Sequence, residues 1–251
     1  MTERLVRHVL ALALSLGLTG AHAAAGDIDN YRSVKETKAE VIRRTEQNIY
    51  PMSGLNPADV REAIKDIKTL KRDEWAHAFV QVGDKYFQRA QGEVSRDKGQ
   101  ARKDYLAAQK LYYFGRWPAP LDSPERAVSY RKEREAFLAG ARLGEFPVEV
   151  VHADFNGHEV PGLLGVPKGA AQAPLVVIVG GLDGWKEARL TQFSYLMSKG
   201  VALLSLDMPG TGESPVKLEK GAEQSLLAVM DKVLARPTVK KVMADEGITL
   251  D

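Results

Sequence analysis

The spacing of the hydrophobic positions changes near Pro147 and divides the sequence into two regions. From about Ile28 to Leu143 the apolar residues recur every three or four positions, which is the spacing of amphipathic helices. One apolar stripe of this kind consists of Trp75, Phe79, Val82 and Tyr86, and a second consists of Tyr105, Ala108 and Tyr112. Aromatic stripes at helical spacing are usually core, so we expect a helical bundle here.

Capping and breaking residues predict where these helices begin and end. Asn56 can cap a helix and Pro57 fits its first turn, so together they predict a helix start. Gly115 and the segment Trp117-Pro118-Ala119-Pro120 predict a break. The segment Ser123-Pro124-Glu125 then predicts the start of another helix.

After Pro147 the pattern becomes that of strands. Residues 148–155 and 158–166 are each typical of a strand, and Asn156-Gly157 between them is a strong signal for a two-residue hairpin turn. This region therefore predicts a β-hairpin.

Two short apolar runs follow the hairpin. Residues 175–179 and 201–206 are rich in β-branched and aliphatic residues, which favours strands buried on both faces. A predicted helix closed by Gly200 lies between them, and another follows and stops before Pro237. The alternation predicts an α/β fold with a mostly parallel sheet.

Composition and charge exclude several classes of protein. The 251 residues are 44% hydrophobic and 27% charged, with 35 Lys and Arg against 33 Asp and Glu, as in ordinary globular proteins. No basic patch stands out, so nothing indicates a nucleic-acid partner. The chain has no cysteine, which excludes disulfides, thiolate metal sites and a cysteine nucleophile. We expect neither a metal nor another cofactor.

The N-terminus predicts a signal peptide over residues 1–23. Arg4 and Arg7 form a positive region, and an apolar stretch from Val9 to Leu18 follows that is too short to span a bilayer. Ala21-His22-Ala23 then matches a cleavage site. The alternatives are an uncleaved anchor and a buried helix. Cleavage would leave no membrane span and indicates a periplasmic or secreted protein.

Glycines after the first apolar run suggest a binding turn. Gly180, Gly181, Leu182 and Asp183 stand between a predicted strand and a predicted helix, where ligands bind in open α/β sheets. Backbone N–H groups there can form an oxyanion hole, which stabilises charge that develops on a carbonyl oxygen. The turn has neither of the glycine-rich phosphate motifs. A turn that needs glycine only for its geometry remains the alternative.

The second post-strand loop contains Asp207, Gly210, Gly212 and Ser214. Asp207 could act as an acid or base, but an aspartate in such a place more often orders a turn through backbone N–H groups, and we favour that role. Ser214 does not lie in the G-x-S-x-G motif of a nucleophile elbow.

The histidines give no catalytic assembly. His8 and His22 belong to the predicted signal peptide, His77 to a predicted helix, and His152 and His158 to the hairpin. A Ser-His-Asp mechanism needs a histidine within reach of an elbow serine, and no such combination can be assembled.

The order of these motifs resembles the α/β-hydrolase superfamily. The similarity is greatest to the esterase-like group that includes 2,6-dihydropseudooxynicotine hydrolase and the fermentation/respiration switch protein. It covers residues from about 30 to 236 and is carried by residues 174–183 and 206–214, with residues 112–118, Tyr130 and residues 135–137 similar to that group's helical cap.

The resemblance implies a helical cap over residues 28–145 and an incomplete α/β-hydrolase sheet over residues 146–251, made of a β-hairpin and parallel strands with flanking helices. It implies Ser-type cleavage of an ester, amide or activated C–C bond in a small molecule, with one oxyanion N–H from Gly181-Leu182. The nucleophile, acid and histidine of the superfamily have no counterparts in this sequence. We therefore expect an N-terminal part of a hydrolase that is inactive alone.

A second hypothesis is a degenerate hydrolase that acts as a non-catalytic binding or self-association module. An incomplete sheet would expose an edge strand, so a homo-oligomer is a possible way to cover it.

Overall fold

A computed structural model describes residues 32–116, 123–169 and 173–236. These residues form two compact units, which divide between Glu145 and Phe146. We name them the helical unit, up to Glu145, and the sheet unit, from Phe146. The predicted signal peptide and the predicted break at residues 117–120 lie outside the described residues.

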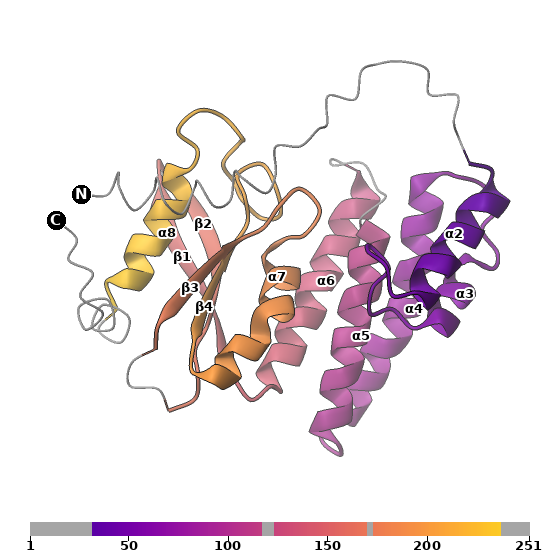
Figure 1. Cartoon of the computed structure of the whole chain (residues 1–251), viewed down its shortest axis with the longest axis horizontal. Coiled ribbons are helices and arrows are strands. Elements are labelled where there is room, and N and C mark those ends of the chain that lie inside the picture. Colours follow the sequence, from indigo (N-terminus) through magenta and orange to yellow (C-terminus); the bar gives the residue numbers. More distant parts are fainter. Residues whose placement is uncertain (1–31, 117–122, 170–172, 237–251) are drawn as a thin grey trace. The chain divides into compact units, whose positions relative to one another are not determined.

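The helical unit is built from antiparallel helix neighbours joined by short connections (Figure 1). Its helices are α2 (Val34–Glu46), α3 (Pro57–Ile64), α4 (Arg72–Glu93), α5 (Lys98–Arg116) and α6 (Pro124–Arg142). The predicted starts at residues 56–57 and 123–125 are confirmed. The Asn56 side chain caps α3 by accepting a hydrogen bond from the Ala58 N–H, and Ser123 caps α6 in the same way.

The aromatic stripes form the core of this unit, as predicted. Phe79 of α4 and Phe114 of α5 are buried and meet edge to face with ring centroids 4.4 Å apart. The prediction that Gly115 breaks the helix is wrong, because α5 continues to Arg116. A Cβ at Gly115 would lie 3.0 Å from the Ala76 carbonyl oxygen, so this glycine allows two helices to approach closely.

The sheet unit contains a four-stranded sheet and its flanking helices. The elements in chain order are β1 (Val148–Phe155), β2 (His158–Gly165), β3 (Leu175–Val179), α7 (Lys186–Phe193), the 3₁₀ helix η1 (Ser194–Lys199), β4 (Ala202–Leu206) and α8 (Gln224–Leu234). The hairpin is confirmed, and both Asn156 and Gly157 adopt the positive φ angles that its two-residue turn requires.

The strand order is β1-β2-β4-β3. β2 runs antiparallel to both of its neighbours, and only β3 and β4 are parallel. The described sheet is therefore mixed, and the prediction of a mostly parallel sheet is wrong for these strands. The hairpin accounts for the difference, because its return strand pairs directly with β4.

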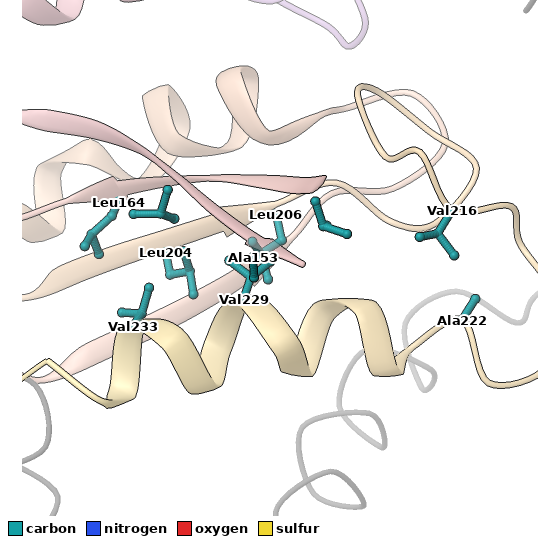
Figure 2. Packing of buried hydrophobic residues seen from close by; sticks show 10 residues of the cluster. Ala153, Leu164, Leu204, Leu206, Val216, Ala222, Val229 and Val233 are labelled. Carbon is teal, nitrogen blue, oxygen red and sulfur yellow. The ribbon is translucent and has the colours of Figure 1, made fainter. Parts of the chain in front are cut away.

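Helix α8 covers one face of the sheet and α7 the other (Figure 1). Figure 2 shows Val229 and Val233 of α8 against Leu204 and Leu206 of β4, and all four are fully buried. Burial of such side chains contributes about 1.5–3 kcal/mol each, so this contact fixes α8 on the sheet.

The two apolar runs differ in burial. Every residue of β4 is buried, as predicted. β3 is only partly buried, with 39% of Val176 exposed, so the prediction of burial on both faces is wrong for β3. The cause is position, because β3 is the last strand of the described sheet.

No helix within the described ranges combines the length and apolar character that crossing a membrane requires.

The predicted helix after β3 consists of two parts, because the α-helix α7 is followed from Ser194 by the 3₁₀ helix η1. Gly200 then stops it in the left-handed conformation, as predicted.

Candidate functional site

The two glycine-containing loops meet at one end of the sheet. β3 and β4 are parallel and end together, with Val179 paired to Leu206. The N–H of Gly180 donates to the Leu206 carbonyl oxygen at 2.8 Å and joins the first loop to the end of β4. This edge, beyond the carboxyl ends of parallel strands, is where open α/β sheets bind ligands.

The turn after β3 has a fixed shape. The Gly181 N–H donates to the Gly184 carbonyl oxygen at 2.9 Å, and the Trp185 indole Nε1–H donates to the Leu182 carbonyl oxygen at 3.1 Å. A Cβ at Gly180 would lie 2.7 Å from the Gly184 carbonyl oxygen, so the turn requires glycine there. Asp183 lies exposed in the same turn.

Only one of the two oxyanion candidates has a free N–H. The Gly181 N–H is used inside the turn, whereas the Leu182 N–H has no hydrogen-bond partner among the described residues. Leu182 is also well exposed, at 68% of its surface. The assignment of an oxyanion donor stays a prediction, and the geometry limits it to Leu182.

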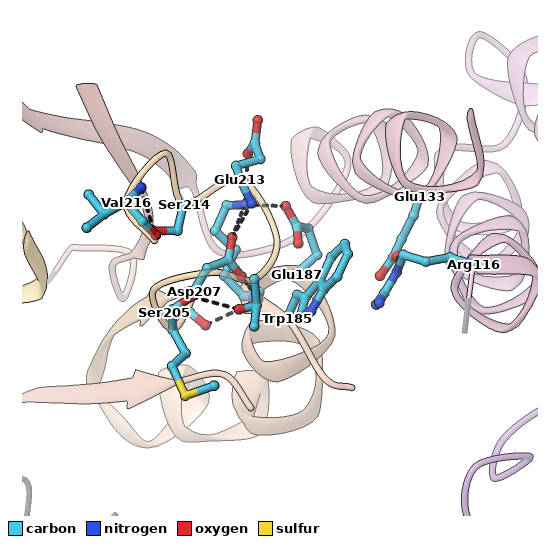
Figure 3. A network of polar contacts seen from close by, with 12 residues as sticks. Arg116, Glu133, Trp185, Glu187, Ser205, Asp207, Glu213, Ser214 and Val216 are labelled. Atoms are coloured by element: carbon cyan, nitrogen blue, oxygen red, sulfur yellow. Dashed lines mark hydrogen bonds and ion pairs between the residues drawn. The ribbon is translucent and has the colours of Figure 1, made fainter. Parts of the chain in front are cut away.

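Asp207 connects the two loops. Its carboxylate is buried at 3% exposure and accepts hydrogen bonds from the Lys186 N–H and the Lys186 ammonium, both at 2.8 Å, and from the Glu213 N–H at 3.0 Å. Figure 3 shows Asp207 in a network of polar contacts that also includes Glu187 and Glu213. Asp207 therefore orders the turn through backbone N–H groups, the role we favoured from the sequence.

Lys186 is the buried cation of this network. Its ammonium contacts Glu187 at 2.9 Å and Asp207 and Glu213 at 2.8 Å each. Burial alone would lower the pKa of Lys186, but the charges of Glu187, Asp207 and Glu213 outweigh burial and raise that pKa above its ordinary value. Lys186 is therefore charged at neutral pH and is not poised to act as a base.

The loop after β4 is shaped around Asp207. Gly210 and Gly212 have φ angles of 78° and 57°, which few other residues adopt. A Cβ at Gly212 would clash with the Asp207 carboxylate. The Gly210 N–H donates to the Val216 carbonyl oxygen at 2.7 Å and closes the loop. Both glycines are needed for the backbone path that brings Glu213 to Asp207.

Sequence reasoning missed Lys186 and Glu213. A signal for Lys186 was available, because it stands at the first position of α7, where the positive end of the helix dipole disfavours a cation. A lysine at such a position, between apolar strands, indicates buried carboxylate partners. Nothing in the sequence identified Asp207 as that partner, because it lies 21 positions away.

The serine and histidine candidates do not contact one another in a catalytic arrangement. The Ser214 hydroxyl donates to the Val216 carbonyl oxygen at 3.3 Å. His152 lies 3.6 Å from the Glu159 carboxylate, and His77 contacts Gln81 at 2.9 Å. Within the described part of the chain no histidine is hydrogen-bonded to a serine, and no group of histidines and carboxylates could hold a metal ion.

The helical unit contains a pocket of about 410 Å³ between α3 and α4. Its floor is apolar, with Ile67 and Val82, and its rim is charged, with the ion pair of Glu62 and Lys85.

A buried ion pair lies deeper in the helical unit. Arg116 Nε donates to the Glu133 carboxylate at 2.7 Å, and both side chains are almost wholly buried. The guanidinium also lies 4.7 Å from the centre of the Tyr113 ring. This pair joins α5 to α6.

Comparison with known proteins identifies the family. The model of the FrsA-like esterase family matches residues 60–242. The chain belongs to the FrsA-like esterase family. It is 25% identical over 202 residues to the esterase FrsA of Yersinia pestis (strain Pestoides F), an alignment that covers 71% of this chain and 47% of the relative. The chain thus spans about half the length of the curated relatives it matches.

Solved structures show the same fold. The crystal structure of 2,6-dihydroxy-pseudo-oxynicotine hydrolase matches with a TM-score of 0.61 at 19% identity, over 74% of this chain and 52% of that one. Wild-type AbyA5 matches with a TM-score of 0.56 at 21% identity, over 80% of this chain and 52% of that one. The predicted membership of the α/β-hydrolase superfamily is confirmed, as is the fold class.

Proposed function

We propose that this chain carries the oxyanion side of a Ser-type hydrolase that cleaves an ester, amide or activated C–C bond in a small molecule. The observation that carries the proposal is the free Leu182 N–H, held at the carboxyl end of β3 by a turn with fixed hydrogen bonds. A fixed donor in such a place stabilises the charge that develops on a carbonyl oxygen, because it needs no reorganisation during the reaction.

The same proposal makes the chain inactive by itself. One N–H donor binds an oxyanion but cannot form one, since acyl transfer needs a nucleophile and a base. The sequence contains no G-x-S-x-G motif and no histidine after His158. In the superfamily these groups follow the segment that this chain matches.

Esterase assays test the inactivity. The purified chain, incubated with p-nitrophenyl acetate and p-nitrophenyl butyrate, should release no more p-nitrophenol than buffer does. A fluorophosphonate probe should label none of its serines, while a serine esterase serves as the positive control. Turnover that a single Ser→Ala change abolishes would overturn the inactivity, and turnover that survives replacement of every serine would overturn Ser-type chemistry.

The oxyanion role is tested in a longer protein, if the genomic reading frame continues beyond codon 251 into a G-x-S-x-G motif. There Leu182→Pro, which removes the N–H, should lower kcat by about 10²–10³ with little change in KM. Leu182→Ala keeps the N–H and is the matched control. Equal kcat values for the two variants would refute the role.

The alternative function is a non-catalytic binding or self-association module. The outer edge of β3, which has no partner strand among the described residues, favours it, because an unpaired strand edge binds other strands. A firm stop at codon 251 together with cooperative unfolding of the purified chain would favour this alternative over the hydrolase.

A further inference from the structure

The pocket between α3 and α4, which we name the α3–α4 pocket, is formed by residues of the helical unit. Its walls are the last turn of α3, the segment that connects α3 to α4, and one face of α4. The α4 residues that line it, from Glu74 to Lys85, recur every three or four positions and therefore share that face. Its volume of about 410 Å³ is within the range of about 300–1,000 Å³ in which proteins bind small molecules.

Hydrogen bonds hold the connecting segment in place beside α4. The Glu74 carboxylate accepts from the Lys68 N–H at 2.8 Å and also from the Thr69 hydroxyl. The Trp75 indole Nε1–H donates to the Thr69 carbonyl oxygen at 3.0 Å. The wall that this segment forms is therefore fixed before a ligand binds, as in most small-molecule sites.

The floor of the pocket is apolar. Ala63, Ile67 and Val82 line it and are buried, each at most 6% exposed. Ala78 lies on the same face of α4 and is half-buried. The two alanines leave space because their side chains are small, and Ile67 and Val82 provide apolar contact. An apolar ring that binds there is removed from water, which favours binding.

The charges on the rim are already compensated. Glu62 forms an ion pair with Lys85, and Asp66 lies 3.9 Å from the Lys65 ammonium. The Glu74 carboxylate is used by the connecting segment. A charged ligand would have to compete with a charge that is already bound, so the rim favours a neutral ligand.

His77 and Gln81 give the pocket a specific polar group. The Gln81 amide nitrogen lies 2.9 Å from His77 Nε2. An amide nitrogen only donates, so Nε2 of the neutral ring accepts and the ring proton is on Nδ1. The His77 Nδ1–H and the Gln81 carbonyl oxygen have no further partner among the described residues. One is a donor and the other an acceptor, and a hydroxyl group can bond to both.

We propose that the α3–α4 pocket binds a small neutral molecule with an apolar ring and a hydroxyl group. The ring lies on the floor against Ile67 and Val82, and the hydroxyl bonds to His77 and Gln81. This site goes beyond the proposed hydrolase function and does not depend on it, because every residue it uses belongs to the helical unit.

NMR titration of the intact chain with p-cresol tests the proposal, at a pH above the ordinary pKa of histidine. The amide signals that shift should saturate and should belong to residues 62–85. Toluene, which lacks the hydroxyl, should bind about three- to tenfold more weakly. Three results would overturn the proposal: shifts that do not saturate, shifts mainly outside residues 62–85, or tighter binding of 4-methylbenzoate or 4-methylbenzylamine than of p-cresol.

A pair of variants tests the hydroxyl contact. Leucine at both His77 and Gln81 removes the polar groups, and both positions are exposed, so the fold should be unaffected. The affinity for p-cresol should fall about three- to tenfold, to that for toluene, while toluene binds no more weakly than before. Gln88→Leu, at an exposed position of α4 outside the pocket, is the matched control and should bind p-cresol normally. An unchanged p-cresol affinity in the double variant, or an equal loss in Gln88→Leu, would refute the contact.

Discussion

At the scale of single residues, Lys186 and Asp207 determine the shape of the candidate site. Asp207 binds one loop through the Lys186 N–H and the other through the Glu213 N–H, so a single carboxylate sets the separation of the two loops. Lys186 neutralises part of the negative charge that would otherwise stay buried. The Leu182 N–H lies in the turn that this pair supports.

Lys186→Met should therefore destabilise the sheet unit strongly. It removes the cation that contacts Glu187, Asp207 and Glu213, and removal of one partner from a buried ion pair costs about 3–5 kcal/mol. Urea unfolding followed by tryptophan fluorescence measures the loss, since Trp185 is adjacent and buried. The control is Lys232→Met on the exposed side of α8, which should change the free energy of unfolding little. Similar decreases in the free energy of unfolding for both variants would show that the buried ion-pair network does not stabilise the sheet unit.

At the scale of elements, close contacts between helices explain why glycine occurs inside α4 and α5. A Cβ at Gly83 of α4 would lie 2.6 Å from the Tyr112 ring of α5. The Tyr112 hydroxyl in turn donates to the Asp84 carboxylate at 2.6 Å and keeps the ring in place. Gly83 therefore allows α4 and α5 to pack closely.

Gly83→Ala and Gly92→Ala form a matched pair on one helix. The alanine at position 83 should destabilise the helical unit by about 1–3 kcal/mol, because the methyl group overpacks the contact with Tyr112. At Gly92 the nearest atom belongs to the Arg96 side chain at 3.9 Å, so alanine there should stabilise by up to about 1 kcal/mol through helix propensity. Thermal unfolding followed by circular dichroism measures both, and the same sign for the two would refute the packing argument.

At the scale of the whole molecule, the two units have separate hydrophobic cores. One core lies among α3, α4 and α5, and the other between the sheet and α8. Each core is assembled from side chains of its own unit, and a compact unit with its own core can in principle fold alone.

A fragment of residues 29–145 should consequently fold without the sheet unit. We expect helical circular dichroism, one cooperative urea transition, and slow amide exchange in α4 and α5 that matches the intact chain. A fragment with the Phe79→Ala change, which empties the core, is the control and should lose this cooperativity. A non-cooperative parent fragment would show that the helical unit depends on the rest of the molecule.

The sequence predicted most elements, because they depend on local signals. Asn56-Pro57 starts a helix through its own side chain and ring, and Asn156-Gly157 turns a hairpin through its own φ angles. The sequence also located the two loops of the candidate site. It did not separate Gly181 from Leu182, since the use of an N–H depends on the fold of the turn.

The sequence by itself determined the helical and α/β regions, the starts of α3 and α6, the turn of the hairpin and the family resemblance, because periodicity, caps and turns act over a few residues. Only the tertiary structure decided that, among the described strands, β4 is central and β3 is at the edge, although both are apolar runs of similar length. It alone brought Lys186 to Asp207, across 21 positions of the chain. Strand order and buried ion pairs depend on contacts between distant segments, and no local pattern specifies which segments meet.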